Sequence, residues 1–270
     1  KKVIWSIRTS STRKAGSYLT NILVFINAVV SWFIPDKIIC VSYSAVKIHV
    51  SIGYNKKKIN YIPNGYDLNA ISKLLKSKTK SRTKDLLKIK NNFMVVTSIA
   101  RLNPQKDHRT FLKSANEVLK VKNNVYFICI GKDIPNLKKE VITLVNKKYH
   151  KNILLLGEKD NVYEILNISD IFCLHSIYEA FPNVLVEAMA SKKICISTDV
   201  GDAREILGDN NFIVKTKEYL KLAKKILSIL EYKKTVKERI ENKNRLKIKN
   251  KFALSDISKK YLKIYKKVVR

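Results

Sequence analysis

Short apolar runs alternate with amphipathic stretches along almost the whole chain. Apolar runs of four to eight residues bounded by turn residues predict buried strands, and apolar positions that recur every three or four residues predict helices packed on them. Such alternation is typical of an α/β protein whose parallel sheet is flanked by helices. The strands predicted in this way are residues 3–8, 37–42, 59–62, 93–99, 125–130, 153–156, 170–174 and 194–198.

These strands fall into two groups, which predict two units. The first three are too few for a stable doubly wound sheet, so we expect residues 1–66 to form a partial N-terminal domain, and 67–248 to form a complete C-terminal one. Pro63-Asn64-Gly65 and the Lys/Ser/Thr-rich residues 72–84 predict a linker between them. A final helix over 249–270 is expected to pack back toward the N-terminal domain.

Two helical segments can be placed from their pattern. Residues 107–120 carry apolar positions at helical spacing, with Asp107 as the expected N-cap. The tail over 219–270 is helical and Lys-rich, and an apolar stripe near its end should pack on a neighbour. That stripe consists of Phe252, Leu254, Ile257, Tyr261, Ile264 and Tyr265.

The chain is strongly basic. Its 270 residues include 54 basic and 22 acidic side chains, which gives a net charge of +32. A chain of this length with 46% apolar residues folds around a core, which excludes disordered tails and disulfide miniproteins. The basic surface predicts either a phosphate-rich partner or only the Lys drift of an AT-rich coding sequence. No nucleic-acid-binding signature accompanies the Lys runs, so we expect no nucleic-acid partner.

The metal and membrane signals are weak. Cys40, Cys129, Cys173 and Cys195 lie far apart beside apolar runs, which predicts buried free thiols in a reducing compartment and no structural metal. Residues 18–35 are mostly apolar, and we expect a buried or interfacial helix there rather than a membrane-spanning one. The sequence begins at Lys1 without a signal-peptide pattern, and we expect an upstream segment to be missing.

Unusual residues follow the predicted strands of the second group. In open α/β sheets, ligands bind beyond the carboxyl ends of strands, so these loops should converge on one crevice. Two cations, Arg101 and Lys106, suit a diphosphate, although each alone is only one of the chain's 54 basic residues. The loops contribute Arg101, Lys106, Gly131, Gly157, His175 and Glu179.

A helix is predicted to begin at Pro182, whose missing N–H suits the first helical position. The amides of Asn183, Val184 and the residues after them would then be unpaired at the positive end of the helix dipole, which favours an anion. Glu187, further along this helix, could accept hydrogen bonds from a vicinal diol such as a ribose. These residues by themselves indicate a site for a nucleotide-like diphosphate.

The sequence around these residues resembles the donor domain of family 4 retaining glycosyltransferases of GT-B fold. The resemblance rests on Arg101 and Lys106, on Gly131 and Gly157, and on the frame Glu179-Ala-Phe-Pro-Asn-Val-Leu-Val-Glu187. Upstream, residues 38–42 and 62–67 look like the end of that family's acceptor domain. The resemblance implies a Rossmann-like donor domain with a parallel sheet beside a partial Rossmann-like acceptor domain. Asp107 and Ala180 stand where that family usually has glycine, and residues 192–194 stand where it usually has a Gly-x-Pro stretch.

The resemblance also implies roles. Arg101 and Lys106 would hold the donor diphosphate and, with Glu179 facing the transferred sugar, act in catalysis. Glu187 would bind the ribose, amides around Phe181, Asn183, Val184 and Leu185 would contact sugar or phosphate, and loops at Gly131 and residues 157–161 would shape the nucleotide pocket. The reaction implied is metal-independent transfer of a hexose from a UDP- or GDP-type sugar, with retention, to an acceptor hydroxyl. The departing phosphate would assist deprotonation of the acceptor, and no further cofactor is expected.

The setting implied is bacterial cell-surface polysaccharide assembly, such as O-antigen or capsule. The partners would be a nucleotide sugar, a glycan or lipid-linked glycan acceptor and an anionic membrane surface, with the protein cytoplasmic and peripheral to the inner face of the membrane. A non-catalytic or truncated sugar-nucleotide-binding module is the alternative. Turnover of a nucleotide sugar would separate the two.

Overall fold

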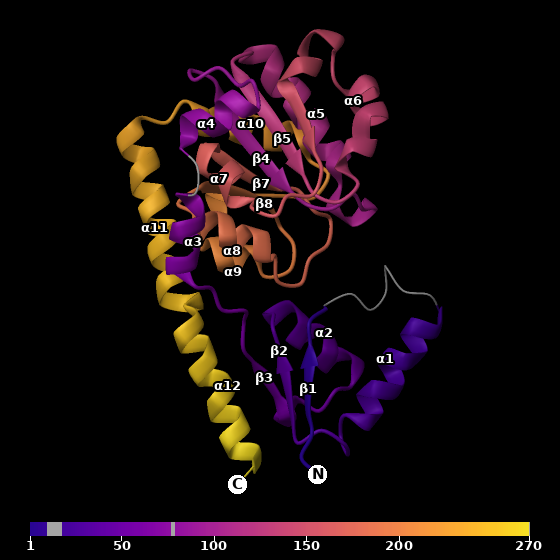
Figure 1. Ribbon diagram of the computed structural model, residues 1–270. Helices are drawn as coiled ribbons and strands as arrows, with labels where there is room; N and C mark the ends of the chain where they lie inside the picture. The colour runs from indigo at the N-terminus through magenta and orange to yellow at the C-terminus, as the bar shows by residue number, and fades with distance from the viewer. Residues whose placement is uncertain (10–17, 77–78, 270) are drawn as a thin grey trace.

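The computed structural model describes residues 1–9, 18–76 and 79–269, and within them two parallel sheets (Figure 1). The small sheet has the order β1-β2-β3, and the large sheet the order β6-β5-β4-β7-β8-β9. Every strand pair is parallel, which confirms the predicted α/β class. The strands are β1 (Ile4–Ile7), β2 (Lys37–Cys40), β3 (Ile59–Tyr61), β4 (Met94–Ile99), β5 (Val125–Ile130), β6 (Ile153–Leu156), β7 (Ile171–Leu174), β8 (Ile194–Thr198) and β9 (Ile213–Val214).

Helices connect and cover these strands. Among the described residues the α-helices are α1 (Tyr18–Val30), α2 (Tyr43–Ile52), α3 (Leu68–Leu75), α4 (Lys80–Leu86), α5 (His108–Val121), α6 (Lys138–Leu144), α7 (Tyr163–Ile168), α8 (Asn183–Ala190), α9 (Ala203–Leu207), α10 (Tyr219–Leu230), α11 (Lys234–Phe252) and α12 (Leu254–Val269). The main core surrounds the large sheet, where α5 packs on α10 and α8 packs on α11, β7 and β8.

The order of the large sheet creates a topological switch point. From β4 the chain proceeds through β5 to β6 on one side, and from β7 it proceeds through β8 to β9 on the other. The strands β4 and β7 are neighbours, so the loops that leave their carboxyl ends diverge above the sheet. Such a crevice is where doubly wound proteins bind ligands.

The strand predictions agree with the structure to within one or two residues at each end. Buried apolar side chains on both faces cause this agreement, since β5, β7 and β8 are almost wholly buried. Strand β9 was missed because two residues are too few to make a pattern. The predicted cap of α5 is confirmed, since the Asp107 carboxylate accepts from the Thr110 amide.

The linker predicted over residues 72–84 is wrong. The end of α3 and most of α4 lie there, and both helices pack on α7. Their polar composition hides short amphipathic helices, in which Ile71 and Thr83 are buried and Asp67 and Thr79 cap the amino ends. The chain crosses from the small sheet to the large one nearer to residues 62–67.

The C-terminal helices run along one side of the molecule, from the large sheet down to the small one (Figure 1). Phe252 is buried in the main core, while Ile257 packs with Ile39 and Ile62 of the small sheet. Of the predicted stripe, Leu254 and Tyr265 are instead exposed. Between α11 and α12 the backbone pairs with residue 66, since the Tyr66 amide donates to Phe252 and the Leu254 amide donates to Tyr66.

Helix α1 and the turn after it expose large apolar side chains, including those of Phe25, Trp32 and Phe33. Of residues 22–35, whose burial the structure describes, Ala28, Ser31 and Pro35 are buried and most others are exposed, so this segment is not the buried helix that was one of the two expectations. Among the described residues, no helix combines the length and apolar character needed to cross a membrane. The four cysteines are buried and free, as predicted.

Candidate functional site

The predicted site residues lie at the switch point between β4 and β7. Arg101 and Lys106 follow β4, and Glu179 follows β7. Helix α8, which contains Glu187, begins directly after the Glu179 loop. The sheet order therefore gathers residues that are up to 86 positions apart in the sequence.

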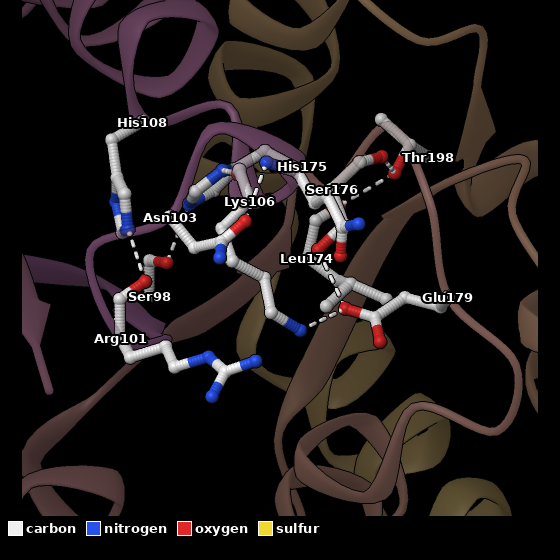
Figure 2. A network of polar contacts seen from close by, with 11 residues as sticks. Ser98, Arg101, Asn103, Lys106, His108, Leu174, His175, Ser176, Glu179 and Thr198 are labelled. Carbon is white, nitrogen blue, oxygen red and sulfur yellow. Dashed lines mark hydrogen bonds and ion pairs between the residues drawn. The ribbon is translucent and has the colours of Figure 1, made fainter. Parts of the chain in front are cut away.

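Lys106 and Glu179 form an ion pair that joins the loop after β4 to the loop after β7 (Figure 2). The Lys106 Nζ atom lies 2.5 Å from Glu179 Oε1, and the two side chains are only 21% and 13% exposed. The Ser176 hydroxyl donates to the same carboxylate oxygen at 2.7 Å. Partial burial makes this pair stronger than the surface pairs elsewhere on the chain, and it fixes the ammonium at the rim of the crevice.

Arg101 provides a second, uncommitted cation. Its side chain is exposed and lies beside that of Lys106 in Figure 2, and it has no hydrogen-bond or ion-pair partner among the described residues. Gly131 packs closely against the loop that carries Arg101. A Cβ at this position would lie 2.3 Å from the Ala100 carbonyl oxygen, so a larger residue would not fit. The nearby amide of Leu102 donates to the Lys132 carbonyl at 2.8 Å. Gly131 thus allows two loops to approach closely, with a φ of +146°.

The amino end of α8 offers free backbone amides. Helix α8 begins at Asn183, so Pro182 is its N-cap rather than its first residue, and no side chain caps it. The Leu185 amide already donates to the Pro182 carbonyl, whereas those of Asn183 and Val184 have no backbone partner in the described chain. The side chains of Phe181 and Leu185 are buried in the core. This end of α8 can therefore accept an anion through two amides and the helix dipole.

Glu187 is a half-buried carboxylate without a hydrogen-bond partner among the described residues. Burial raises the pKa of Glu187. Burial, and to a smaller extent the charge of Glu187, also raises the pKa of Tyr66 and raises that of Tyr163 to about 12. Both phenols therefore lie near the carboxylate. A carboxylate held in this way is ready to accept hydrogen bonds from ligand hydroxyls.

The Asn183 side chain has a structural contact of its own. Its Oδ1 atom accepts from Asn64 Nδ2 at 2.7 Å and from the Tyr66 hydroxyl at 2.6 Å. These bonds tie the start of α8 to the segment that leaves the small sheet.

Gly157 has open space around it, and Asn161 caps the start of α7 through the Tyr163 amide. The loop at 157–161 thus places Tyr163 beside Glu187.

The residues that depart from the family pattern differ in backbone conformation. Asp107 and Lys192 adopt positive φ angles of 49° and 57°, so each takes up the left-handed conformation that glycine adopts freely. Ala180 does not have a positive φ, so a side chain costs nothing in backbone strain there. The backbone geometry of the site is thus kept without these glycines.

Sequence reasoning missed the layer beneath the two cations. His175, which was only a weak candidate, is buried and bonded to the Lys106 carbonyl and to Ser98, and His108 bonds to the Arg101 carbonyl. A polar residue in a buried strand, as Ser98 is, could have signalled this layer. In the described part of the chain, no group of three or more His, Cys, Asp or Glu side chains could hold a metal ion.

Comparison with known proteins identifies the family of this chain. The family model for glycosyl transferases group 1 matches residues 79–246. An α-1,3-galactosyltransferase of Escherichia coli, named for UDP-Gal and a GlcNAc-diphosphoundecaprenol, is 32% identical over 163 residues, which cover 58% of this chain and 39% of the relative. The matched part of this chain therefore spans about two fifths of that relative's length.

Solved structures show the same fold. A glycosyltransferase from Rickettsia africae superposes with a TM-score of 0.77 at 26% identity, over 87% of this chain and 64% of that one. HepE of Anabaena, solved in complex with UDP, superposes with a TM-score of 0.86 at 17% identity, over 99% of this chain and 72% of that one. At that identity the second likeness concerns the fold alone.

The fold defines a GT-B type protein, with a doubly wound sheet whose switch point carries Arg101, Lys106 and the amino end of α8. The chain belongs to the glycosyl transferases of group 1.

Proposed function

We propose that this chain carries the nucleotide-sugar site of a retaining hexosyltransferase that acts, without a metal, in cell-surface polysaccharide assembly. One observation carries the proposal: four kinds of group lie in the loops and the helix that follow β4 and β7. They are a guanidinium and a carboxylate without a described partner, an ammonium fixed by an ion pair, and two helix amides without a backbone partner among the described residues. This set matches a ligand that has both a diphosphate and a vicinal diol. A nucleoside diphosphate sugar of UDP or GDP type has both.

Each group has a role in this proposal. Arg101 and Lys106 would bind the diphosphate and stabilise the charge that grows on it as the bond to the sugar breaks. The amides of Asn183 and Val184 would hold an anionic or hydroxyl oxygen, and Glu187 would accept from the ribose. Glu179, fixed by Lys106 and Ser176, would face the sugar, and the departing phosphate would take the proton of the acceptor hydroxyl.

Calorimetry with UDP-, GDP- and ADP-sugars in the absence of metal tests this proposal. We expect one nucleotide to bind, and Glu187→Ala to weaken its affinity about 30-fold, because hydrogen bonds to a charged group contribute about 1.5–3 kcal/mol. Glu238→Ala, which removes an exposed acid on α11, is the matched control. Equal affinity in both variants would remove Glu187 from the site. Binding without any transfer or hydrolysis would favour the non-catalytic module.

We further propose that the acceptor is a lipid-linked glycan, reached at an anionic membrane on its cytoplasmic side. The printed name of the Escherichia coli relative contains a diphosphoundecaprenol, which supports a lipid-linked acceptor. The apolar side chains exposed by α1 and the following turn lie next to a basic segment at 56–58, where the Lys58 ammonium donates to the Trp32 carbonyl at 2.6 Å. Exposed aromatic side chains beside lysines suit the interface of an anionic bilayer.

Vesicle sedimentation tests the membrane proposal. Replacing Trp32 and Phe33 with serine should lower partition onto vesicles of mixed anionic and zwitterionic lipids about tenfold, because two apolar side chains no longer enter the interface. Val121→Ser, which removes an exposed apolar side chain at the end of α5, should leave partition unchanged. If the wild-type chain bound zwitterionic and anionic vesicles equally well, the proposed role of the lysines would be wrong.

A further inference from the structure

Two buried histidines lie beneath the two cations of the site, and each contacts the backbone of one of them (Figure 2). The Nδ1 atom of His175 lies 2.5 Å from the Lys106 carbonyl oxygen, and the Nε2 atom of His108 lies 3.2 Å from the Arg101 carbonyl oxygen. The two rings meet edge to face, with centroids 5.1 Å apart. The pair thus joins the two backbone positions that carry the site's positive charges.

The partners fix the tautomer of each ring. A carbonyl oxygen only accepts hydrogen bonds, so the nitrogen that faces it must carry the proton. His175 is therefore protonated on Nδ1, and its Nε2 atom accepts from the Ser98 hydroxyl at 2.5 Å. His108 is protonated on Nε2, and its buried Nδ1 atom has no partner among the described residues.

Both rings are neutral and held in place. Burial lowers the pKa of each histidine, that of His175 to about 3. The Lys106 ammonium makes a smaller contribution in the same direction to both pKa values, and His108 does so for that of His175. The His175 ring also stacks on Phe111, with centroids 4.8 Å apart and planes 23° apart. A neutral ring has one N–H, so each histidine can hold only one carbonyl.

The backbone next to Lys106 has an unfavourable conformation, which the bond from His175 helps to hold. Directly after Lys106, Asp107 adopts the left-handed conformation, which is costly for a residue with a side chain. The same loop receives a second bond, from the Ile177 amide to the Gln105 carbonyl at 2.8 Å. The loop after β7 thus holds the loop after β4 in the position that lets the Lys106 ammonium reach Glu179.

We propose that His175 and His108 are positioning residues, which hold the backbone of Lys106 and Arg101 so that both cations face the bound diphosphate. This rests on the proposed function, since the benefit of the arrangement is diphosphate binding. Neither ring touches the ligand space itself. Each ring donates one N–H to one carbonyl. His175 donates from Nδ1 to the Lys106 carbonyl, whereas His108 donates from Nε2 to the Arg101 carbonyl.

That difference allows a reciprocal test. An Asn side chain places its amide nitrogen near the position of Nδ1, and a Gln side chain places it near that of Nε2. We expect His175→Gln to weaken UDP or GDP binding about tenfold and His175→Asn less than threefold, since one lost hydrogen bond amounts to about 0.5–1.5 kcal/mol. At His108 the order should reverse, with Asn the damaging substitution and Gln the tolerated one.

A purely structural role predicts a different result, because all four variants remove a buried ring. The free energy of unfolding should therefore fall in all four, while affinity follows the reciprocal pattern. Equal losses of affinity for Asn and Gln at each position would overturn the proposal.

A second measurement separates this proposal from the proposed function. In nitrogen-resolved NMR, the Lys106 ammonium protons should exchange slowly because of the pair with Glu179, and this signal should persist in His175→Asn and be lost in His175→Gln. If the wild-type chain bound no nucleotide but the signal behaved in this way, the proposed function would fail and the positioning role would stand. If both variants kept the signal, the positioning role would be overturned.

Discussion

Replacing Lys106 with alanine should weaken binding of a nucleoside diphosphate about 100-fold, because two effects add. The variant loses a charge-assisted contact to the diphosphate. It also leaves the Glu179 carboxylate, whose side chain is 13% exposed, without its cation, so that a negative charge now faces the incoming anion. Calorimetry with UDP and GDP, without metal, measures the change.

The net charge of +32 makes the control for this experiment essential. Any lysine attracts an anion over a distance, and salt screens that attraction. Lys221→Ala removes an exposed lysine on α10 that pairs only with Glu218 among the described residues, and it should change affinity less than twofold at 0.15 M salt. If Lys106→Ala weakened binding no more than Lys221→Ala, the ion pair would be a structural contact outside the diphosphate site.

The large sheet was predictable because its strands are buried on both faces. The residues of β5 and β8 read as continuous apolar runs, and turn residues follow each of them. The linker was mispredicted for the opposite reason. Helices α3 and α4 bury little more than Ile71 and Thr83, so their Lys, Ser and Thr content outweighs the periodic signal.

The charged site residues were predictable from their place after strands, but their mutual contacts were not. Nothing in the sequence pairs Lys106 with Glu179 in preference to Arg101, since this depends on the direction in which each loop leaves the switch point. The contacts of His175 and His108 with the Lys106 and Arg101 carbonyls could not be predicted from the sequence either, because every residue has a backbone carbonyl. The position of Pro182 illustrates the limit at helix ends, where the structure shifts the start by one residue.

Phe111→Ala should lower the free energy of unfolding by about 4 kcal/mol, the largest stability change that we expect from a single substitution in this chain. Phe111 is fully buried, meets Phe127 edge to face with centroids 5.6 Å apart, and supports the His175 ring from the other side. Its removal leaves a cavity between the sheet and α5. Urea unfolding followed by far-ultraviolet circular dichroism measures the loss. Tryptophan fluorescence would not report on this core, since Trp5 lies in β1 of the small sheet and Trp32 follows α1.

The same substitution tests whether core and site are coupled. Val121→Ala, at the exposed end of the same helix, should change the free energy of unfolding by less than about 0.5 kcal/mol and leave nucleotide affinity unchanged. Phe111→Ala should in addition weaken nucleotide binding under conditions where the chain is fully folded, because the His175 ring loses the face on which it stacks and holds Lys106 less firmly. A variant that lost stability but bound UDP or GDP like the wild type would show that the Lys106 loop is held without the ring stack.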